Sequence, residues 1–250
     1  MGTRGSRGGV VSTGAALGAA SILKQKLLRI AAHLLEAPLE DLELVDGCIR
    51  VRGTPTSGMT IAQLAQKAYF APTELPPGMV PGLEATHAFD PPPLTFSSGT
   101  HICQVEIDPE TGVLTIPRYT IVEDCGRMLN PRIVEGQLHG ATAQGLGGAL
   151  LEEVVYDADG QNRSATLLDY AIPIAALMPS FEVEHLERLD PNTPLGMKGM
   201  AEGGVMGASA AISNAVADAL APLGVAAGRQ PFTPRRLADA LRAARAGPVP

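Results

Sequence analysis

Apolar residues recur with the spacing of an amphipathic helix from about Gly14 to Ala37. The apolar positions, which follow a period of about 3.6 residues, are Leu17, Ile22, Leu23, Leu27, Ile30, Ala31 and Leu34. Pro38 ends this pattern, because proline cannot continue a helix. A second helical run, T-I-A-Q-L-A-Q-K-A-Y, begins at Thr60, and Gln63 stands at the spacing of a capping box. The pattern therefore predicts two helices in the first part of the chain.

Alternating apolar and polar residues predict two hairpins. The run L-E-L-V-D-G-C-I-R-V-R-G alternates around Asp46-Gly47, a dipeptide that favours a tight turn. The run T-H-I-C-Q-V-E-I-D-P-E-T-G-V-L-T-I-P-R-Y-T-I-V-E-D contains two alternating stretches joined by residues 108–112. Between the two hairpins, residues 70–96 are rich in proline and have almost no period, so we interpret them as an ordered loop or linker.

Two further helices are predicted where small residues dominate. The first, I-V-E-G-Q-L-H-G-A-T-A-Q-G-L-G-G-A-L-L-E-E, follows Pro131, and the second extends from about Ser209 to Leu220. Glycine destabilises a helix relative to alanine, so its frequency here indicates that another backbone approaches closely. Between them the chain reads G-M-K-G-M-A-E-G-G-V-M-G, a glycine loop that holds one carboxylate, Glu202.

These elements predict an α+β protein with two lobes. We expect residues 1–71 to form the first lobe, residues 72–95 a proline-rich linker, residues 96–240 a hairpin-and-helix lobe with the glycine loop at its rim, and residues 241–250 a tail. The order of elements lacks the regular alternation of strand and helix that a doubly wound parallel sheet requires.

Composition and charge narrow the class of protein. The chain has 250 residues, of which 45% are hydrophobic and 18% charged, as in a folded domain. The net charge of -7 argues against a nucleic-acid surface. Cys48, Cys103 and Cys125 are widely spaced, so they predict neither a disulfide framework nor an iron–sulfur cluster. We find no run of about 20 apolar residues and therefore expect no membrane span. The mildly acidic charge favours a cytoplasmic enzyme or subunit.

Two stretches could bind a polar ligand. In G-T-R-G-S-R-G-G at the start, glycines flank a hydroxyl and two guanidinium groups, which could hold a phosphate, although such a stretch alone is more often a flexible leader. Gln137 and His139 lie in the first turns of the helix after Pro131. The Gln137 amide could bond a ligand, whereas a buried amide satisfied within the protein is the more common case. No histidine or cysteine stands at a zinc-binding spacing, so we predict no metal ligand.

Glu202 has two possible roles on the residues alone. Lys198 precedes it by four residues, so the two could form a surface ion pair that contributes little to stability. Glu202 could equally be a general base, because glycine neighbours leave room for a substrate and a cofactor.

Several long stretches, in this order, resemble the large subunit of molybdenum hydroxylases, the family of xanthine dehydrogenase, aldehyde oxidase and aerobic carbon monoxide dehydrogenase. They are G-T-R-G-S-R-G-G, D-P-E-T-G, D-C-G-R-M-L-N-P-R-I-V-E-G-Q-L-H-G-A-T-A-Q-G-L-G-G-A-L-L-E-E, L-D-Y-A-I-P and G-M-K-G-M-A-E-G-G. The resemblance covers residues 2–240 and corresponds to the C-terminal third of that subunit. It implies the two-lobed C-terminal part of a molybdopterin-binding domain, in which residues 1–71 close a cofactor-binding lobe.

The resemblance also implies a cofactor and its contacts. The cofactor is molybdopterin with molybdenum, commonly in the cytosine dinucleotide form in bacteria. Gly5, Ser6 and Arg7 match the loop that contacts its phosphates or nucleotide. Gln137 matches a glutamine whose amide reaches the pterin or the ligands of the metal.

Glu202 matches the glutamate of the K-G-x-G-E-type motif, which is the general base of the family. Ala201 replaces the usual glycine, a change that adds one methyl group and keeps the carboxylate. The implied reaction uses water as the oxygen source to hydroxylate an aldehyde, an N-heterocycle or a related substrate, or to oxidise carbon monoxide.

The resemblance implies several partners. They are the remainder of the large subunit, an iron–sulfur subunit, a flavin subunit and a small-molecule substrate, and this chain itself is expected to hold no iron–sulfur or flavin site. The segments that select the substrate lie upstream in the family. A non-catalytic remnant or assembly module of such a complex is the alternative.

Overall fold

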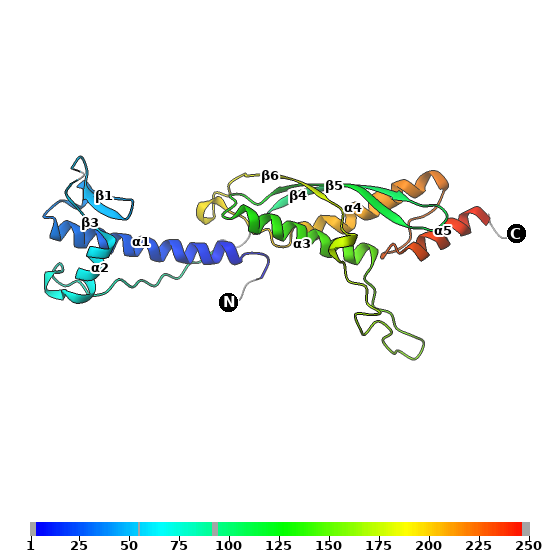
Figure 1. The fold of residues 1–250 in the computed structure, drawn as a ribbon, viewed down its shortest axis with the longest axis horizontal. Helices are drawn as coiled ribbons and strands as arrows, with labels where there is room; N and C mark the ends of the chain where they lie inside the picture. Colours follow the sequence, from blue (N-terminus) through cyan, green and yellow to red (C-terminus); the bar gives the residue numbers. More distant parts are fainter. Residues whose placement is uncertain (1–3, 55, 92–94, 247–250) are drawn as a thin grey trace. The chain divides into compact units, whose positions relative to one another are not determined.

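The computed structural model describes residues 4–54, 56–91 and 95–246. The chain forms two compact units, one of residues 11–91 and the other of residues 95–246 together with residues 4–10 (Figure 1). The boundaries of the first unit differ from those of the predicted lobe, residues 1–71, because residues 4–10 pack with the unit that carries Glu202.

The unit of residues 11–91 contains most of helix α1 (Gly8–Leu34), followed by a three-stranded sheet and helix α2 (Ile61–Phe70). Strands β1 (Leu42–Val45), β2 (Cys48–Val51) and β3 (Gly58–Thr60) are antiparallel, and single-turn helices lie at Leu39–Asp41 and Pro72–Glu74. Asp46 and Gly47 have φ of 48° and 73°, the left-handed conformation of a tight hairpin turn. The Thr60 capping box is present, so the predicted hairpin and helix start are confirmed.

Part of the core of this unit comes from the segment that we predicted to be a linker, residues 72–95. Leu75 is only 6% exposed, and Met79 and Leu83 pack against the same cluster. Other members of the cluster are Leu27, Leu28, Ile30, Ala31, Leu42, Ile49, Leu64 and Ala68. Residues 72–91 are thus an ordered part of the unit, because Leu75 is buried and Met79 and Leu83 are half-buried against its core, although the segment has no sequence period.

The other unit is built on a mixed sheet. Strands β4 (Ser98–Ile107) and β5 (Leu114–Asp124) form the predicted antiparallel hairpin, and β6 (Phe181–Leu186) pairs with β5 in parallel. Helices α3 (Pro131–Leu150), α4 (Gly203–Leu220) and α5 (Pro234–Ala246) complete the unit (Figure 1), with single turns at Ala175–Leu177, Pro194–Gly196 and Ala221–Leu223. The predicted α+β class is confirmed, and neither sheet is doubly wound.

Helices α3 and α4 pack closely and run in the same direction. A Cβ atom built on Gly145 would lie 2.6 Å from the Cβ of Ala208, and one built on Gly204 would lie 2.6 Å from the carbonyl oxygen of Leu138. The predicted close approach of another backbone is thus confirmed. Helix α4 begins at Gly203 instead of about Ser209, because helix packing here outweighs the low helix propensity of glycine.

Helix α4 and the turn after it, Gly203–Leu223, have the length and mean hydropathy of a membrane span, which we did not expect from the sequence. The helix packs against α3 and β4. Its buried row faces the interior of the unit and consists of Gly204, Ala208, Ile212, Val216 and Leu220. This helix therefore serves as a core helix of the unit.

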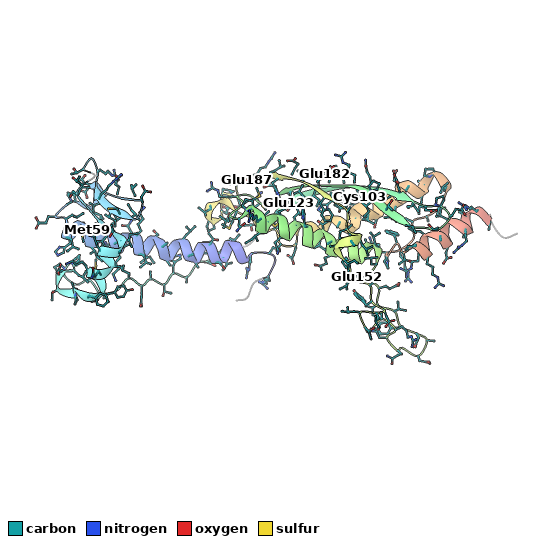
Figure 2. The ribbon with its side chains drawn as sticks, viewed as in Figure 1. Met59, Cys103, Glu123, Glu152, Glu182 and Glu187 are labelled. Atoms are coloured by element: carbon teal, nitrogen blue, oxygen red, sulfur yellow. The ribbon has the colours of Figure 1, made fainter. Side chains whose placement is uncertain are left out.

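Two segments of this unit were not predicted from the sequence. Helix α5 continues to Ala246 and buries Leu237 and Leu241, so residues 241–246 are helical and not part of a tail. Residues 151–178 leave the helices and the sheet as a long excursion (Figure 1) that exposes Leu167 and Leu168. Within this excursion, the hydroxyl of Tyr170 donates a hydrogen bond to Glu152 (labelled in Figure 2).

The contact between α3 and α4 can be tested with one substitution at two sites. We expect Gly145→Ala to lower the free energy of unfolding by about 1–3 kcal/mol, because its methyl group would overlap Ala208. Gly140 lies on the same helix with no heavy atom within 4 Å of a built Cβ, so Gly140→Ala should instead stabilise by about 0.5–1 kcal/mol. Urea denaturation of both variants measures the difference, and equal effects would contradict close packing at Gly145.

Candidate functional site

The N-terminal turn and the glycine loop meet through a pair of hydrogen bonds. The hydroxyl of Ser6 donates to Oε2 of Glu202 at 2.8 Å, and the backbone N–H of Glu202 donates to the same hydroxyl oxygen at 3.1 Å. These two residues are 196 positions apart in the sequence. The fold thus brings together two of the stretches that we singled out separately.

The backbone of the N-terminal turn is shaped for this contact. Gly5 and Ser6 both have a φ of 58°, a left-handed conformation that is uncommon for serine. The amide of Arg7 closes the turn with a hydrogen bond of 3.4 Å to the carbonyl oxygen of Arg4. A Cβ atom on Gly199 would overlap the carbonyl oxygen of Ser6, so the glycine loop can approach only because that residue has no side chain.

A cavity of about 310 Å³ opens beside this contact. Ser6 and Gln137 both line it, so the predicted cofactor contacts from the N-terminal turn and from α3 face one space. The side chain of Gln137 is exposed and not buried within the protein, which removes the interpretation of a purely structural amide. His139 instead packs its ring against Phe181, with centroids 5.3 Å apart.

The remaining lining of the cavity combines polar and apolar groups. Arg127 and Asn130 come from the loop between β5 and α3, and Met197 and Met200 come from the glycine loop. Hydroxyl, amide and guanidinium donors next to thioether and aliphatic surface suit a polar ring system that carries acceptor atoms. Arg127 was not predicted as a site residue from the sequence, although it lies within the D-C-G-R stretch that supported the family resemblance.

Glu202 stands at the N-terminal end of α4 and is exposed. Its side chain does not cap the helix, and its described hydrogen bond is the one from Ser6. The alternative of a surface ion pair with Lys198 is wrong. The Nζ atom of Lys198 lies 2.9 Å from Oδ2 of Asp124, and the side chains of this pair are only 12% and 7% exposed.

The pair of Lys198 and Asp124 fixes the glycine loop to the end of β5. Burial alone would raise the pKa of Asp124, but hydrogen bonds from the amides of Gly126 and Arg188 and from Lys198 hold that pKa below its ordinary value. The amide of Lys198 also donates to the carbonyl oxygen of Cys125 at 2.8 Å. Burial raises the pKa of the Cys125 thiol, so this cysteine is not an activated nucleophile.

Within the described ranges, no group of three or more histidine, cysteine, aspartate or glutamate side chains is arranged to hold a metal ion.

Comparison with known proteins identifies the family. Residues 1–179 match the family model described as molybdopterin cofactor-binding domain. The chain belongs to this family. Over 241 residues, or 96% of the chain, it is 41% identical to the nicotine 6-hydroxylase large subunit of Paenarthrobacter nicotinovorans. Over 242 residues it is 37% identical to the carbon monoxide dehydrogenase large chain of Hydrogenophaga pseudoflava. The predicted resemblance to molybdenum hydroxylase large subunits is confirmed.

Solved structures of the molybdopterin-binding family share the fold. Quinoline 2-oxidoreductase from Pseudomonas putida 86 matches 96% of this chain with a TM-score of 0.88 and 44% identity. Reconstituted carbon monoxide dehydrogenase from Oligotropha carboxidovorans matches 98% of it with a TM-score of 0.90 and 36% identity. The chain spans about 30% of the length of the two curated relatives and 31% and 30% of these two structures.

The buried ion pair behind the glycine loop makes a prediction about stability. Lys198→Gln leaves Asp124 buried without its cation, so we expect the free energy of unfolding at pH 7 to fall by about 3 kcal/mol. The folded-state pKa of Asp124 lies below the unfolded value of about 3.9. Its stabilisation is therefore present above that value and is lost as the pH falls through the folded pKa.

Chemical denaturation of both proteins from pH 7 to pH 2 measures this effect. The difference between wild type and Lys198→Gln should shrink below about pH 4. Lys67→Gln, which removes the exposed pair with Glu74, is the control and should cost less than about 1 kcal/mol. Equal losses for the two lysines would contradict a structural role for the buried pair.

Proposed function

We propose that this chain is the part of a molybdenum hydroxylase large subunit that holds the molybdopterin cofactor and supplies the general base, Glu202. The observation that carries this proposal is the hydrogen-bonded contact of Ser6 with Glu202 beside the cavity that Ser6 shares with Gln137. Three separate segments, each matching a cofactor or catalytic motif, thereby supply groups to one place.

The groups around the cavity fit the chemistry of such a cofactor. A pterin dinucleotide presents ring acceptor atoms and phosphates, and the cavity offers the Ser6 hydroxyl, the Gln137 amide and the Arg127 guanidinium. In this proposal Gly5, Ser6 and Arg7 hold the phosphates or nucleotide, the cytosine dinucleotide form is the one bound, and Gln137 orients the pterin. When bound, the molybdenum cofactor supplies two-electron redox chemistry and activation of the oxygen that comes from water.

The proposed role of Glu202 is to accept a proton. The hydroxyl of Ser6 engages Oε2 and not Oε1, so Oε1 can take up the proton of the attacking oxygen group. The side chain is exposed, and the neighbouring glycines leave space in front of it. Ser6 orients the carboxylate without adding a charge, because a hydroxyl is neutral.

The substrate we favour is an N-heterocycle. Two relatives with 41% and 44% identity are named for their action on nicotine and quinoline, which both contain such a ring. An aldehyde or carbon monoxide is the alternative substrate, and carbon monoxide dehydrogenases are among the relatives.

We propose that the chain acts in a heteromeric cytoplasmic complex. The partners are the remainder of the large subunit, an iron–sulfur subunit and a flavin subunit, which carry electrons away from the molybdenum. A relative named as a subunit of the 6-hydroxypseudooxynicotine dehydrogenase complex, 37% identical over 238 residues, supports an assembly of this kind.

The role of Glu202 is tested in the assembled enzyme by Glu202→Gln, which keeps the size and removes the base. We expect turnover per bound molybdenum to fall by roughly 10²–10⁴-fold with unchanged molybdenum content. Glu184→Gln, the same change at an exposed position of β6, should leave turnover unaltered.

Near-normal turnover of Glu202→Gln would refute the catalytic role. A purified complex that contains no molybdenum would instead favour the alternative that the chain is a non-catalytic remnant or assembly module.

A further inference from the structure

The excursion of residues 151–178 (Figure 1) exposes large apolar side chains along most of its length. Leu168 is 97% exposed and Leu167 is 76% exposed. The other exposed apolar residues of the segment are Val154, Val155, Tyr156, Ile172, Ile174 and Leu177. A single exposed apolar side chain needs no explanation, whereas a concentration of them in one segment is typical of a surface that another molecule covers.

The two ends of the excursion meet at Gly147 on α3. The amide of Glu152 donates to the carbonyl oxygen of Gly147 at 2.8 Å. A Cβ atom on Gly147 would lie 2.8 Å from Cδ of Pro173, so the returning chain packs there as well. The hydroxyl of Tyr170 joins both ends by donating to Oε2 of Glu152 at 2.6 Å. The excursion therefore leaves and re-enters the unit at one fixed place.

Hydrogen bonds hold the first half of the excursion as a small hairpin. Tyr156 and Asn162 form an antiparallel bridge. Next to it, the amide of Arg163 donates to the carbonyl oxygen of Val155 at 2.7 Å, and the amide of Val155 donates to the hydroxyl of Ser164 at 2.9 Å. Backbone polar groups are thus paired within the segment. Its shape does not require its apolar side chains to be buried.

Two leucines occupy the corners of the turn of residues 166–169. The amide of Asp169 donates to the carbonyl oxygen of Thr166 at 3.0 Å, which closes the turn. The hydroxyl of Thr166 donates to Oδ2 of Asp169 at 2.8 Å and accepts from the amide of Leu168 at 3.3 Å. Turn corners are usually glycine, proline, asparagine, aspartate or serine. Here a frame of polar contacts instead presents Leu167 and Leu168 to solvent.

We propose that the excursion is a preorganised docking element, whose Leu167 and Leu168 insert into an apolar pocket of the remainder of the large subunit. This inference rests on the proposed function, which supplies that partner. A turn that is already held by its own hydrogen bonds loses little conformational entropy on binding. Burial of the two leucines therefore contributes to affinity with little opposing cost.

The solved relatives favour this partner over a second copy of the chain. The match to the carbon monoxide dehydrogenase structure covers 98% of this chain, and the part left out is much shorter than residues 151–178. This chain spans only 30% of that structure's chain. The excursion is thus common to both, and the unmatched part of the longer chain is a fitting cover. A twofold dimer requires a self-complementary patch, whereas a turn with two projecting side chains requires a concave acceptor.

Photo-cross-linking identifies what covers the turn. A leucine analogue that carries a diazirine replaces leucine in the 250-residue chain before the chain is combined with the remainder of the large subunit and its partners. In the assembled complex, we expect mass spectrometry to find residues 167 and 168 joined to peptides of that remainder. Cross-links only to a second copy of this chain, to the iron–sulfur subunit, to the flavin subunit or to solvent would overturn the proposal.

Leu168→Ser tests whether the leucine contributes to binding. The variant should raise the dissociation constant between the chain and the remainder of the large subunit by about tenfold or more, because burial of a leucine contributes at least that factor. Leu223→Ser, the same change at an exposed leucine after α4, is the control and should leave the dissociation constant unchanged. Equal dissociation constants for the two variants would overturn the proposal.

Both substituted leucines are exposed, so neither change should unfold the chain. Neither measurement requires molybdenum or turnover. A complex that assembles without molybdenum would contradict the proposed function and leave the docking result unaffected, so the two failures are distinguishable.

Discussion

The contact of Ser6 with Glu202 is the constraint on which the site depends. One hydroxyl both donates to the carboxylate and accepts from the backbone N–H of the same residue, so it fixes the side chain and the main chain together. The left-handed backbone at Ser6 costs of order 1–3 kcal/mol, which such a contact helps to offset. The buried pair of Lys198 and Asp124 holds the other end of the glycine loop. Glu202 is therefore held from both sides although it is exposed.

Short-range chemistry made part of this fold predictable. The Asp46-Gly47 turn, the capping box at Thr60 and the turn after Asp108 each depend on residues within a few positions of one another. Proline at the start of α3 and the asparagine cap before it also act locally. The motifs of the site were recognisable for the same reason, since each lies within one continuous stretch.

The remaining features depend on residues far apart in the sequence. Asp124 is 74 positions from Lys198, and nothing near Lys198 distinguishes it from a surface lysine. From the sequence alone, Glu123 is the polar end of a predicted strand. Only the fold shows that it lies in register with Gly99 and is covered by α4. The start of α4 was misplaced because glycine has low helix propensity, which close packing against α3 outweighs. The packing of residues 4–10 with the unit of residues 95–246 likewise depends on contacts between residues far apart in the sequence.

The two glycines around Glu123, Gly99 and Gly203, limit which substitutions this sequence can accept. At positions 99 and 203 a methyl group is excluded only while the longer glutamate side chain fills the space between them. Shortening Glu123 to aspartate would free volume that alanine at either position could occupy, whereas alanine alone would clash. The effects of substitutions at these three positions should consequently be non-additive, because each residue determines what the others tolerate. Among homologous sequences, this trio would vary as a set and not as three independent positions.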